Sequence, residues 1–178
     1  MKFSLNNLSF NPNETGRIEE NLILPGFLGI GTQKGGTTSL QKLLCADQRI
    51  FLPACKEVHY FTLHHQQPVQ WYSDHFKSAS KEQFCGEITP YYLFHPDAAK
   101  RIKKLLPKVL LIVLLRDPVE RAISQYFHAI RHGFETLELE DALKVEKERI
   151  ATGNLYSHQK HSYLSRSYYL EQLNFKSS

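Results

Sequence analysis

The sequence contains few cysteines and no long apolar segment. Its three cysteines, Cys45, Cys55 and Cys85, show no paired spacing, so we expect reduced thiols, packed as small apolar side chains, in a cytoplasmic protein. The longest apolar run, Val109–Leu115, is far shorter than the ~20 residues that a membrane-spanning helix needs. Residues 1–20 are polar and carry no secretory signal. The sequence therefore predicts a cytoplasmic chain without a transmembrane segment.

The sequence also gives no indication of a metal site or a nucleic-acid-binding surface. Nine histidines are scattered without the spacing of metal ligands, and the formal net charge is only +4. A charge of this size suits an anionic ligand held in a local site. The 178 residues and the hydrophobic content of 42% fit one globular domain. We expect a polar lead-in over residues 1–24 and a single domain over residues 25–178.

The segment Gly31–Ser39 comes close to a nucleotide-binding P-loop and departs from it at one position. In the pattern G-x-x-x-x-G-K-[ST], Gly31, Gly36 and Thr38 occupy the expected places, but Thr37 stands where the lysine belongs. The lysine lies inside the loop, at Lys34. An apolar run precedes the loop and a helix-compatible segment follows it, so backbone N–H groups at a helix N-terminus would bind a phosphate. The displaced lysine indicates a nucleotide whose reactive group is not a γ-phosphate.

Apolar runs and amphipathic segments alternate along the rest of the chain. Val109–Leu115 is apolar on both faces, which predicts a central parallel strand. Asp117 and Pro118 follow it as an N-cap and a first-turn proline. Other strands are expected at 27–30, at 50–52 and ending near 86–90, and helices at 39–46, 69–76, 96–106, 117–131, 137–150 and 165–173. This order predicts a three-layer α/β fold of the P-loop type, with a central parallel sheet flanked by helices.

A second candidate phosphate site follows the strand at 109–115. Arg116 stands where that strand ends, and Ser124 lies two turns into the following helix, so a guanidinium and a hydroxyl could converge on one phosphate. The alternative is that Arg116 only caps the loop and pairs with Asp117 or Glu120.

At this point the chain resembles the sulfotransferases that use 3′-phosphoadenosine 5′-phosphosulfate (PAPS). The loop Gly31–Ser39 is similar to their 5′-phosphosulfate loop, and Arg116 with Ser124 matches their 3′-phosphate signature. Lys56–Phe61 resembles the segment of the heparan-sulfate-type enzymes that carries the catalytic base. Gly86–Pro90 is similar to the G-E-x-T-P segment that follows in those enzymes. Ser165–Leu173 resembles a helix further downstream, in which Tyr169 falls on the recurrent tyrosine.

The resemblance implies a role for each of these residues. Glu57 is the expected base, with His59 as the fallback. Lys34 would stabilise the bridging oxygen as the S–O bond breaks. The 5′-phosphate would lie against the backbone N–H groups and hydroxyls of Gly35, Gly36, Thr37 and Thr38, with Ser39 completing the loop, and the 3′-phosphate against Arg116 and Ser124. No metal ion is expected, since the sulfuryl group carries less charge than a γ-phosphoryl group.

Alternatives remain for two of the acidic residues. Lys56 and Glu57 could form an ordinary exposed pair. Glu87 could orient Lys34 or a substrate group, or could merely satisfy buried backbone donors.

The chain departs from the family pattern at two points. Ile88 stands where glycosaminoglycan sulfotransferases commonly carry a lysine that helps at the reaction centre. This disfavours a sulfated polysaccharide as the acceptor, and the acceptor hydroxyl or amine could belong to a lipid, a small alcohol or another glycan. Family members also continue with more strands and a basic glycine-containing loop, so we expect a domain that is incomplete at its C-terminus. Its open sheet edge would favour self-association or a partner subunit.

Two alternative functions stay open. The first is a catalytically weak or inactive nucleotide-binding module of the same fold. The second is a P-loop kinase, which Thr37 disfavours.

Overall fold

The computed structural model describes residues 22–176, so most of the lead-in expected over residues 1–24 lies outside the described residues. Its centre is a four-stranded sheet with the order β2-β3-β1-β4, in which every pairing is parallel. The strands are β1 (Phe27–Gly31), β2 (Ile50–Phe51), β3 (Phe84–Ile88) and β4 (Leu110–Val113). Both central strands are buried along their whole length, as parallel strands covered on two faces should be.

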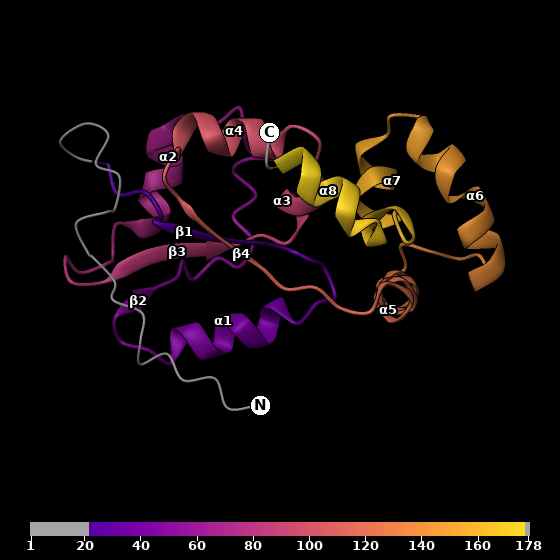
Figure 1. Ribbon diagram of the computed structural model, residues 1–178, viewed down its shortest axis with the longest axis horizontal. Helices are drawn as coiled ribbons and strands as arrows, with labels where there is room; N and C mark the ends of the chain where they lie inside the picture. Colours follow the sequence, from indigo (N-terminus) through magenta and orange to yellow (C-terminus); the bar gives the residue numbers. More distant parts are fainter. Residues whose placement is uncertain (1–21, 177–178) are drawn as a thin grey trace.

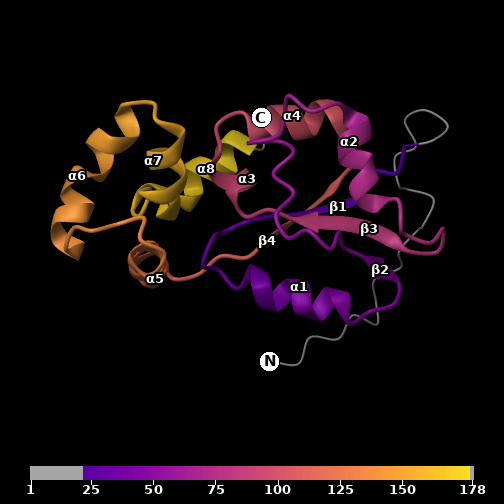
Figure 2. The same ribbon diagram turned by 180° about the vertical axis from the view of Figure 1, so that it is seen from behind.

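Helices cover both faces of this sheet (Figure 1). On one face lies α1 (Thr37–Cys45), which packs through Leu44 against Phe27 and Phe84. The opposite face is covered by α2 (Val69–Ser73) with the short 3₁₀-helix η2 (Asp74–Phe76), by α3 (Tyr91–Phe94) and by α4 (Ala98–Leu105). Figure 2 shows the same layering from behind. The predicted three-layer α/β fold is confirmed.

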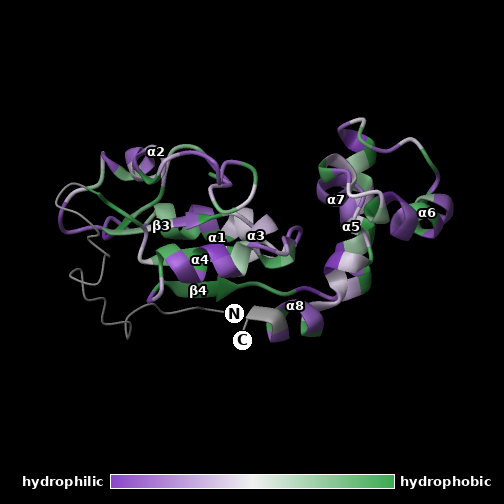
Figure 3. Ribbon diagram, turned by 90° about the horizontal axis from the view of Figure 1, so that it is seen from above, coloured by the Kyte–Doolittle hydropathy of each residue, from purple (hydrophilic) through white to green (hydrophobic). Residues whose placement is uncertain are grey.

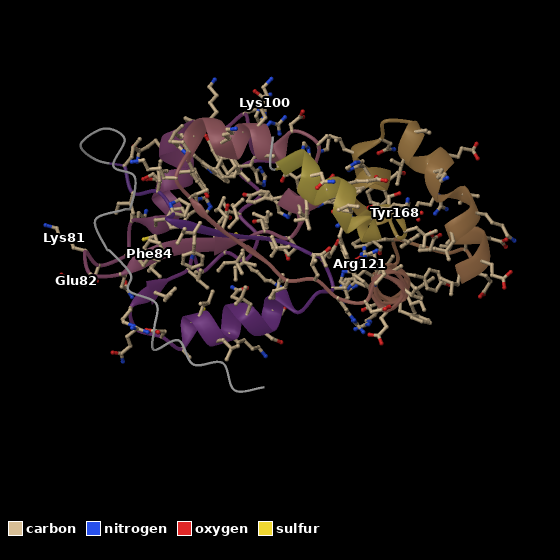
Figure 4. The ribbon with its side chains drawn as sticks, viewed as in Figure 1. Lys81, Glu82, Phe84, Lys100, Arg121 and Tyr168 are labelled. Carbon is tan, nitrogen blue, oxygen red and sulfur yellow. The ribbon has the colours of Figure 1, made fainter. Side chains whose placement is uncertain are left out.

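A second group of helices lies beside the sheet, as Figure 3 shows from above. It holds α5 (Pro118–Arg131), α6 (Leu139–Ala151), α7 (Leu155–Lys160) and the 3₁₀-helix η3 (Ser165–Ser167). The last helix, α8 (Tyr169–Lys176), returns toward the sheet and contacts α3. Asp117 caps α5 as expected, because its carboxylate accepts the N–H groups of Val119 and Glu120. Arg121 of α5 is fully buried and donates to the Ser167 hydroxyl of η3, which joins the two elements (Figure 4).

All four strands end at the same edge of the sheet, because their pairing is parallel. The loops that leave this edge hold residues 32–36 after β1, 52–61 after β2, 89–90 after β3 and 114–117 after β4. The segments that the sequence analysis selected separately are therefore neighbours in space. Hydrogen bonds between the strand ends reinforce the arrangement: Thr32 N–H donates to the Leu114 carbonyl at 2.7 Å, and Thr89 N–H donates to the Gly29 carbonyl at 2.9 Å.

The prediction of a central strand at 109–115 is wrong in position, because β4 lies at the edge of the described sheet. Leu110 and Leu111 of this strand are 54% and 47% exposed. Apolar side chains on both faces show that a strand needs covering, but they do not show whether the described residues provide the cover. The exposed apolar surface continues along α5 through Val119, Ile123, Phe127 and Ile130.

Two short helices and two thiols also differ from expectation. The sequence analysis missed α3 and α7, which are too short to show a helical period. Cys85 is buried as expected, but Cys45 and Cys55 are exposed, and all three are free thiols. None of the described helices is both long and apolar enough to cross a membrane.

Candidate active site

The loop after β1 has the strained backbone that a phosphate-binding turn requires. Gly36, the residue before α1, has φ 100°, and Lys34 has φ 68° although it carries a side chain. A Cβ atom on Gly35 would lie 2.7 Å from the Leu114 carbonyl oxygen, so only glycine fits between the two loops. The N–H of Gly35 donates to the Thr32 carbonyl at 2.9 Å and therefore closes the loop itself.

The free donors of the loop lie at the start of α1. The first N–H groups of an α-helix have no acceptor within the helix, and here they belong to Thr37, Thr38 and Ser39. Ser39 donates instead to the Gly36 carbonyl at 3.0 Å. The N–H groups of Thr37 and Thr38 thus remain for an anion, together with the positive end of the helix.

The loop after β2 brings both candidate bases into contact. Glu57 and His59 have φ 60° and 57°, conformations that residues with side chains seldom adopt. Nε2 of His59 lies 3.4 Å from Oε2 of Glu57, and Nζ of Lys56 lies 3.8 Å from Oε1. Lys56 also donates to the Thr38 hydroxyl at 2.7 Å, which joins this loop to the start of α1. Glu57 is therefore half-buried within a network and is more than an exposed pair with Lys56.

The surroundings of Glu57 keep its carboxylate ionised. Burial by itself raises the pKa of Glu57, but the hydrogen bond and charge of His59, followed by the charges of Lys56 and Arg166, outweigh burial. The pKa of Glu57 consequently lies below its usual value. A carboxylate that is ionised at neutral pH can accept a proton, which is the state that a general base needs.

Arg116 and Ser124 line the same cavity, and the alternative partner of Arg116 is present as well. The guanidinium of Arg116 forms an ion pair with Glu120 at 3.0 Å and donates to the Lys34 carbonyl at 3.4 Å. The hydroxyl of Tyr169 donates to the Arg116 carbonyl at 3.0 Å, so α8 fixes the backbone at this point. The two interpretations of Arg116 are compatible, because the ion pair is exposed and weak.

These loops enclose a cavity of about 480 Å³, a size typical of small-molecule sites. Of the predicted site residues, Gly35 and Ser39 are not in its wall. The predicted residues that line it are Lys34, Gly36, Thr37, Thr38, Glu57, His59, Arg116 and Ser124.

Among the lining residues that the sequence analysis did not select are three basic side chains, His128, Lys160 and Arg166. His128 follows Ser124 by one helical turn and so faces the same cavity, a relationship that the i, i+4 spacing could have revealed. Lys160 and Arg166 come from α7 and η3, and no local pattern places them there. Burial lowers the pKa of His128, and the neighbouring charge of Lys34 lowers it further, so its ring is neutral at pH 7.

Arg166 is a buried cation that holds the glycine loop. Its guanidinium donates to the Gln33 side chain, to the Ser162 hydroxyl at 2.6 Å and to the Gln159 carbonyl at 2.7 Å. It also lies 4.9 Å from the centroid of the Tyr91 ring. Burial lowers the pKa of Arg166 to about 10, which still leaves it charged at neutral pH. We conclude that η3 is connected directly to the loop after β1.

The charges around the cavity are strongly unbalanced. Five cationic side chains line it against the single carboxylate of Glu57, namely Lys34, Lys56, Arg116, Lys160 and Arg166. Burial lowers the pKa of Lys34, and the charges of Arg131, Arg116 and Lys56 lower it further. The cations therefore repel one another, and an anion with several charges would relieve that repulsion.

The donors of the cavity suit such an anion and do not suit a metal ion. Among residues 22–176 no cluster of three or more histidine, cysteine or acidic side chains could hold a metal. The wall offers ammonium, guanidinium, hydroxyl and N–H groups, all of which donate to phosphate or sulfate oxygens. A glycine loop at a helix start, an ionised carboxylate and a surrounding set of cations together form a class of site that suits a ligand with several negative charges.

Comparison with known proteins agrees with this class. The sulfotransferase domain family matches residues 25–175, and the chain belongs to this family. The structure is similar to a crystal structure of a sulfotransferase from Alicyclobacillus acidocaldarius, with a TM-score of 0.77 and 28% sequence identity. That similarity covers 87% of this chain and 68% of the bacterial chain.

The similar curated proteins include heparan sulfate sulfotransferases. The membrane-associated sulfotransferase kil1 of Dictyostelium discoideum is 41% identical over 113 residues, 62% of this chain and 24% of that protein. The mouse bifunctional heparan sulfate N-deacetylase/N-sulfotransferase 4 is 38% identical over 117 residues, 61% of this chain and 13% of that protein. The mouse heparan sulfate glucosamine 3-O-sulfotransferase 3B1 is 36% identical over 103 residues, which are 58% of this chain and 26% of that protein. The chain thus matches about a quarter or less of each.

Proposed function

We propose that this protein transfers the sulfuryl group of PAPS to a hydroxyl or amine of an acceptor. The observation that carries the proposal is the cavity in which five cations and the start of α1 surround one ionised carboxylate. PAPS carries negative charge at both its 3′-phosphate and its 5′-phosphosulfate, so it would relieve the repulsion at two places. Membership of the sulfotransferase family supports the same reaction.

The residues divide the reaction between them. Thr37 and Thr38 would donate to the 5′-phosphate, while Arg116 and Ser124 would hold the 3′-phosphate. Glu57 would accept the proton of the acceptor group as its oxygen or nitrogen forms a bond to sulfur. Lys34 would stabilise the negative charge on the bridging oxygen as the S–O bond breaks and 3′-phosphoadenosine 5′-phosphate leaves.

We propose a glycan as the acceptor, because relatives named for heparan sulfate share 36–38% identity with the chain. Ile88 does not argue against a glycan, since its side chain is 4% exposed and packs with Phe27 and Leu44 beneath the sheet. It is a core residue and leaves the acceptor to other groups of the cavity wall. Lipid and small-alcohol acceptors are the alternatives.

Binding and transfer should be measured separately. We expect calorimetry to show that the chain binds 3′-phosphoadenosine 5′-phosphate and that Lys34→Ala and Arg116→Ala each weaken this binding. Equal affinity for ATP would contradict the nucleotide assignment. With radiolabelled PAPS, transfer to desulfated heparan would support a glycan as the acceptor. Transfer only to sterols or phenols would contradict a glycan acceptor.

The second candidate is a nucleotide-binding module that transfers no sulfuryl group. Such a module would need only the glycine loop and the cations that line the cavity. Tight nucleotide binding without transfer to any acceptor would select this module. Loss of turnover in Glu57→Gln, with nucleotide affinity retained, would select the enzyme.

We also propose that two copies associate through the exposed apolar surface of β4 and α5. The edge of β4 is unpaired among the described residues, and both β4 and α5 carry exposed apolar side chains, among them Leu111 and Phe127. Sedimentation velocity should show a dimer that Leu111→Lys dissociates. A monomeric parent chain would contradict this.

A cytoplasmic location is proposed from the three free thiols. Alkylation of all three in denatured, unreduced cell extract would support it, and recovery of the protein only with membranes would oppose it.

A further inference from the structure

Glu87 carries a buried carboxyl group. Among the described residues, none of its hydrogen bonds involves Lys34 or a backbone N–H group. It lies near the end of β3 and is 1% exposed. Three hydroxyls donate to it: Tyr92 at 2.6 Å, Tyr72 at 2.9 Å and Thr89 at 3.2 Å. Burial raises the pKa of Glu87, and the three hydrogen bonds offset only part of that effect, so its pKa lies above the usual value.

Two of the three hydroxyls also contact the segment that carries the proposed base. The Thr89 hydroxyl accepts the N–H of His59, and the Tyr92 hydroxyl accepts the N–H of Phe61, both at 3.4 Å. Because Thr89 and Tyr92 each donate to Glu87, the hydrogen of each hydroxyl points toward that carboxyl group. The lone pairs of the two hydroxyls then face the backbone of the base segment.

The base segment needs such support because its backbone is strained. Glu57 and His59 both have positive φ, a conformation that residues with side chains keep only where their surroundings hold it. The N–H groups of His59 and Phe61 are held from the side of β3, while the Glu57 side chain faces the cavity. The support therefore acts on the backbone of this short segment and leaves the Glu57 side chain to the cavity.

We propose that Glu87 is a positioning residue for the base, acting through Thr89 and Tyr92 on the backbone of residues 57–61. The role of Glu57 in this statement depends on the proposed sulfuryl transfer, but the hold on the segment does not. Glu87 has no contact with the nucleotide loop, so its replacement should leave nucleotide binding intact.

The chain offers a matched control for this proposal. Tyr72 donates to the same oxygen of Glu87 as Tyr92 does, but its hydroxyl has no contact with the base segment. Its ring stacks on Tyr60 with centroids 4.3 Å apart, a contact that phenylalanine preserves. Tyr72→Phe removes one donor from the carboxylate, whereas Tyr92→Phe removes a donor and a connection to Phe61.

The first measurement is amide hydrogen exchange, which needs no activity. In Glu87→Gln we expect exchange at both His59 and Phe61 to accelerate at least tenfold. In Thr89→Val we expect this acceleration at His59, and in Tyr92→Phe at Phe61. Exchange at Leu28 and Ile30 of β1 should stay unchanged, which shows that the fold is retained. In Tyr72→Phe the exchange at His59 and Phe61 should remain at the parent rate. Unchanged exchange at both amides in Glu87→Gln would overturn the proposal.

The second measurement is turnover with nucleotide affinity as the reference. We expect kcat to fall at least tenfold in Glu87→Gln and Tyr92→Phe with unchanged affinity for 3′-phosphoadenosine 5′-phosphate, and to stay within twofold in Tyr72→Phe. An equal loss of kcat in Tyr72→Phe would reduce Glu87 to a general stabilising residue. A parent chain without turnover would contradict the proposed function alone, because the exchange experiment still decides the hold on the segment.

Discussion

The imidazole of His59 lies 3.4 Å from the carboxylate of Glu57, measured from Nε2 to Oε2. The two residues that compete for the role of base therefore form a contact pair. Nδ1 of His59 lies 3.1 Å from the Thr62 hydroxyl, so both ring nitrogens have a neighbour. In this arrangement the ring supports the carboxylate, which agrees with the proposed role of Glu57 as the base.

The first prediction concerns the pH dependence of catalysis in His59→Ala. The hydrogen bond and charge of His59 lower the pKa of Glu57, so their loss should raise that pKa. Because the base form exists only above the pKa, the acid limb of kcat/KM should move to higher pH. Profiles of kcat/KM against pH measure the shift. Lys56→Met should shift the limb in the same direction by less, and an acid limb unmoved in His59→Ala would contradict the pairing.

The second prediction separates the two partners of Arg116. Arg116→Ala should weaken binding of 3′-phosphoadenosine 5′-phosphate by about 10- to 100-fold, the loss of a charge-assisted contact worth roughly 1.5–3 kcal/mol. Affinity for adenosine 5′-monophosphate, which lacks the 3′-phosphate, should change little. Glu120→Ala is the control, since it removes only the exposed ion pair at 3.0 Å and should not weaken binding. Calorimetry with both nucleotides tests this, and an equal loss for both would place Arg116 elsewhere.

The third prediction compares two neighbouring glycines. Gly36→Ala meets no atom within 4 Å but must keep φ 100°, so it should cost about 1 kcal/mol of stability. Gly35→Ala would place Cβ 2.7 Å from the Leu114 carbonyl oxygen and displace the loop. Thermal unfolding and nucleotide titration should show a larger loss of both stability and affinity for Gly35→Ala. Equal effects would mean that the loop relaxes around the clash.

The fourth prediction is a stability effect far from the cavity. Burial alone would raise the pKa of Glu135, but hydrogen bonds from Arg149, Tyr163 and two backbone N–H groups outweigh it and lower the pKa to about 2. A carboxyl whose pKa is lower in the folded state stabilises the fold above its unfolded pKa of about 4.3, and this stability is lost as the pH falls toward 2. Glu135→Gln should lose on the order of 2 kcal/mol at pH 7 and show a flatter acid decline. Denaturant unfolding of the parent chain and of Glu135→Gln from pH 7 to pH 3 measures how the free energy of unfolding of each falls with pH.

The sequence predicts the layers of this fold well, because each strand and each long helix has its own local pattern. Residues close together in the sequence determine the loop at 31–39, the Asp117 cap and helix α5. Their positions at one edge then follow from the parallel sheet. The edge position of β4 could not be predicted, since pairing order depends on contacts between distant segments.

The candidate site is predicted less completely for the same reason. Lys34, Glu57 and Arg116 stand in recognisable motifs, and the structure brings them to one cavity. Arg166 stands 133 residues from its partner Gln33, so no spacing rule connects them. Glu87 shows the limit most clearly: its motif places it near the site, but the hydroxyls that define its environment come from α2, α3 and the loop after β3.

The exposed thiol of Cys55 lies two residues before Glu57, and its Sγ is 3.7 Å from the Lys56 carbonyl. Cys85 is buried and its pKa is raised to about 11, so it reacts slowly with alkylating reagents. Once Cys45 is replaced by serine, a fluorescent maleimide would therefore attach at one place, next to the proposed base. The emission of such a dye should change when a nucleotide or an acceptor binds beside Glu57. One substitution would therefore turn this chain into an optical sensor of its own ligands.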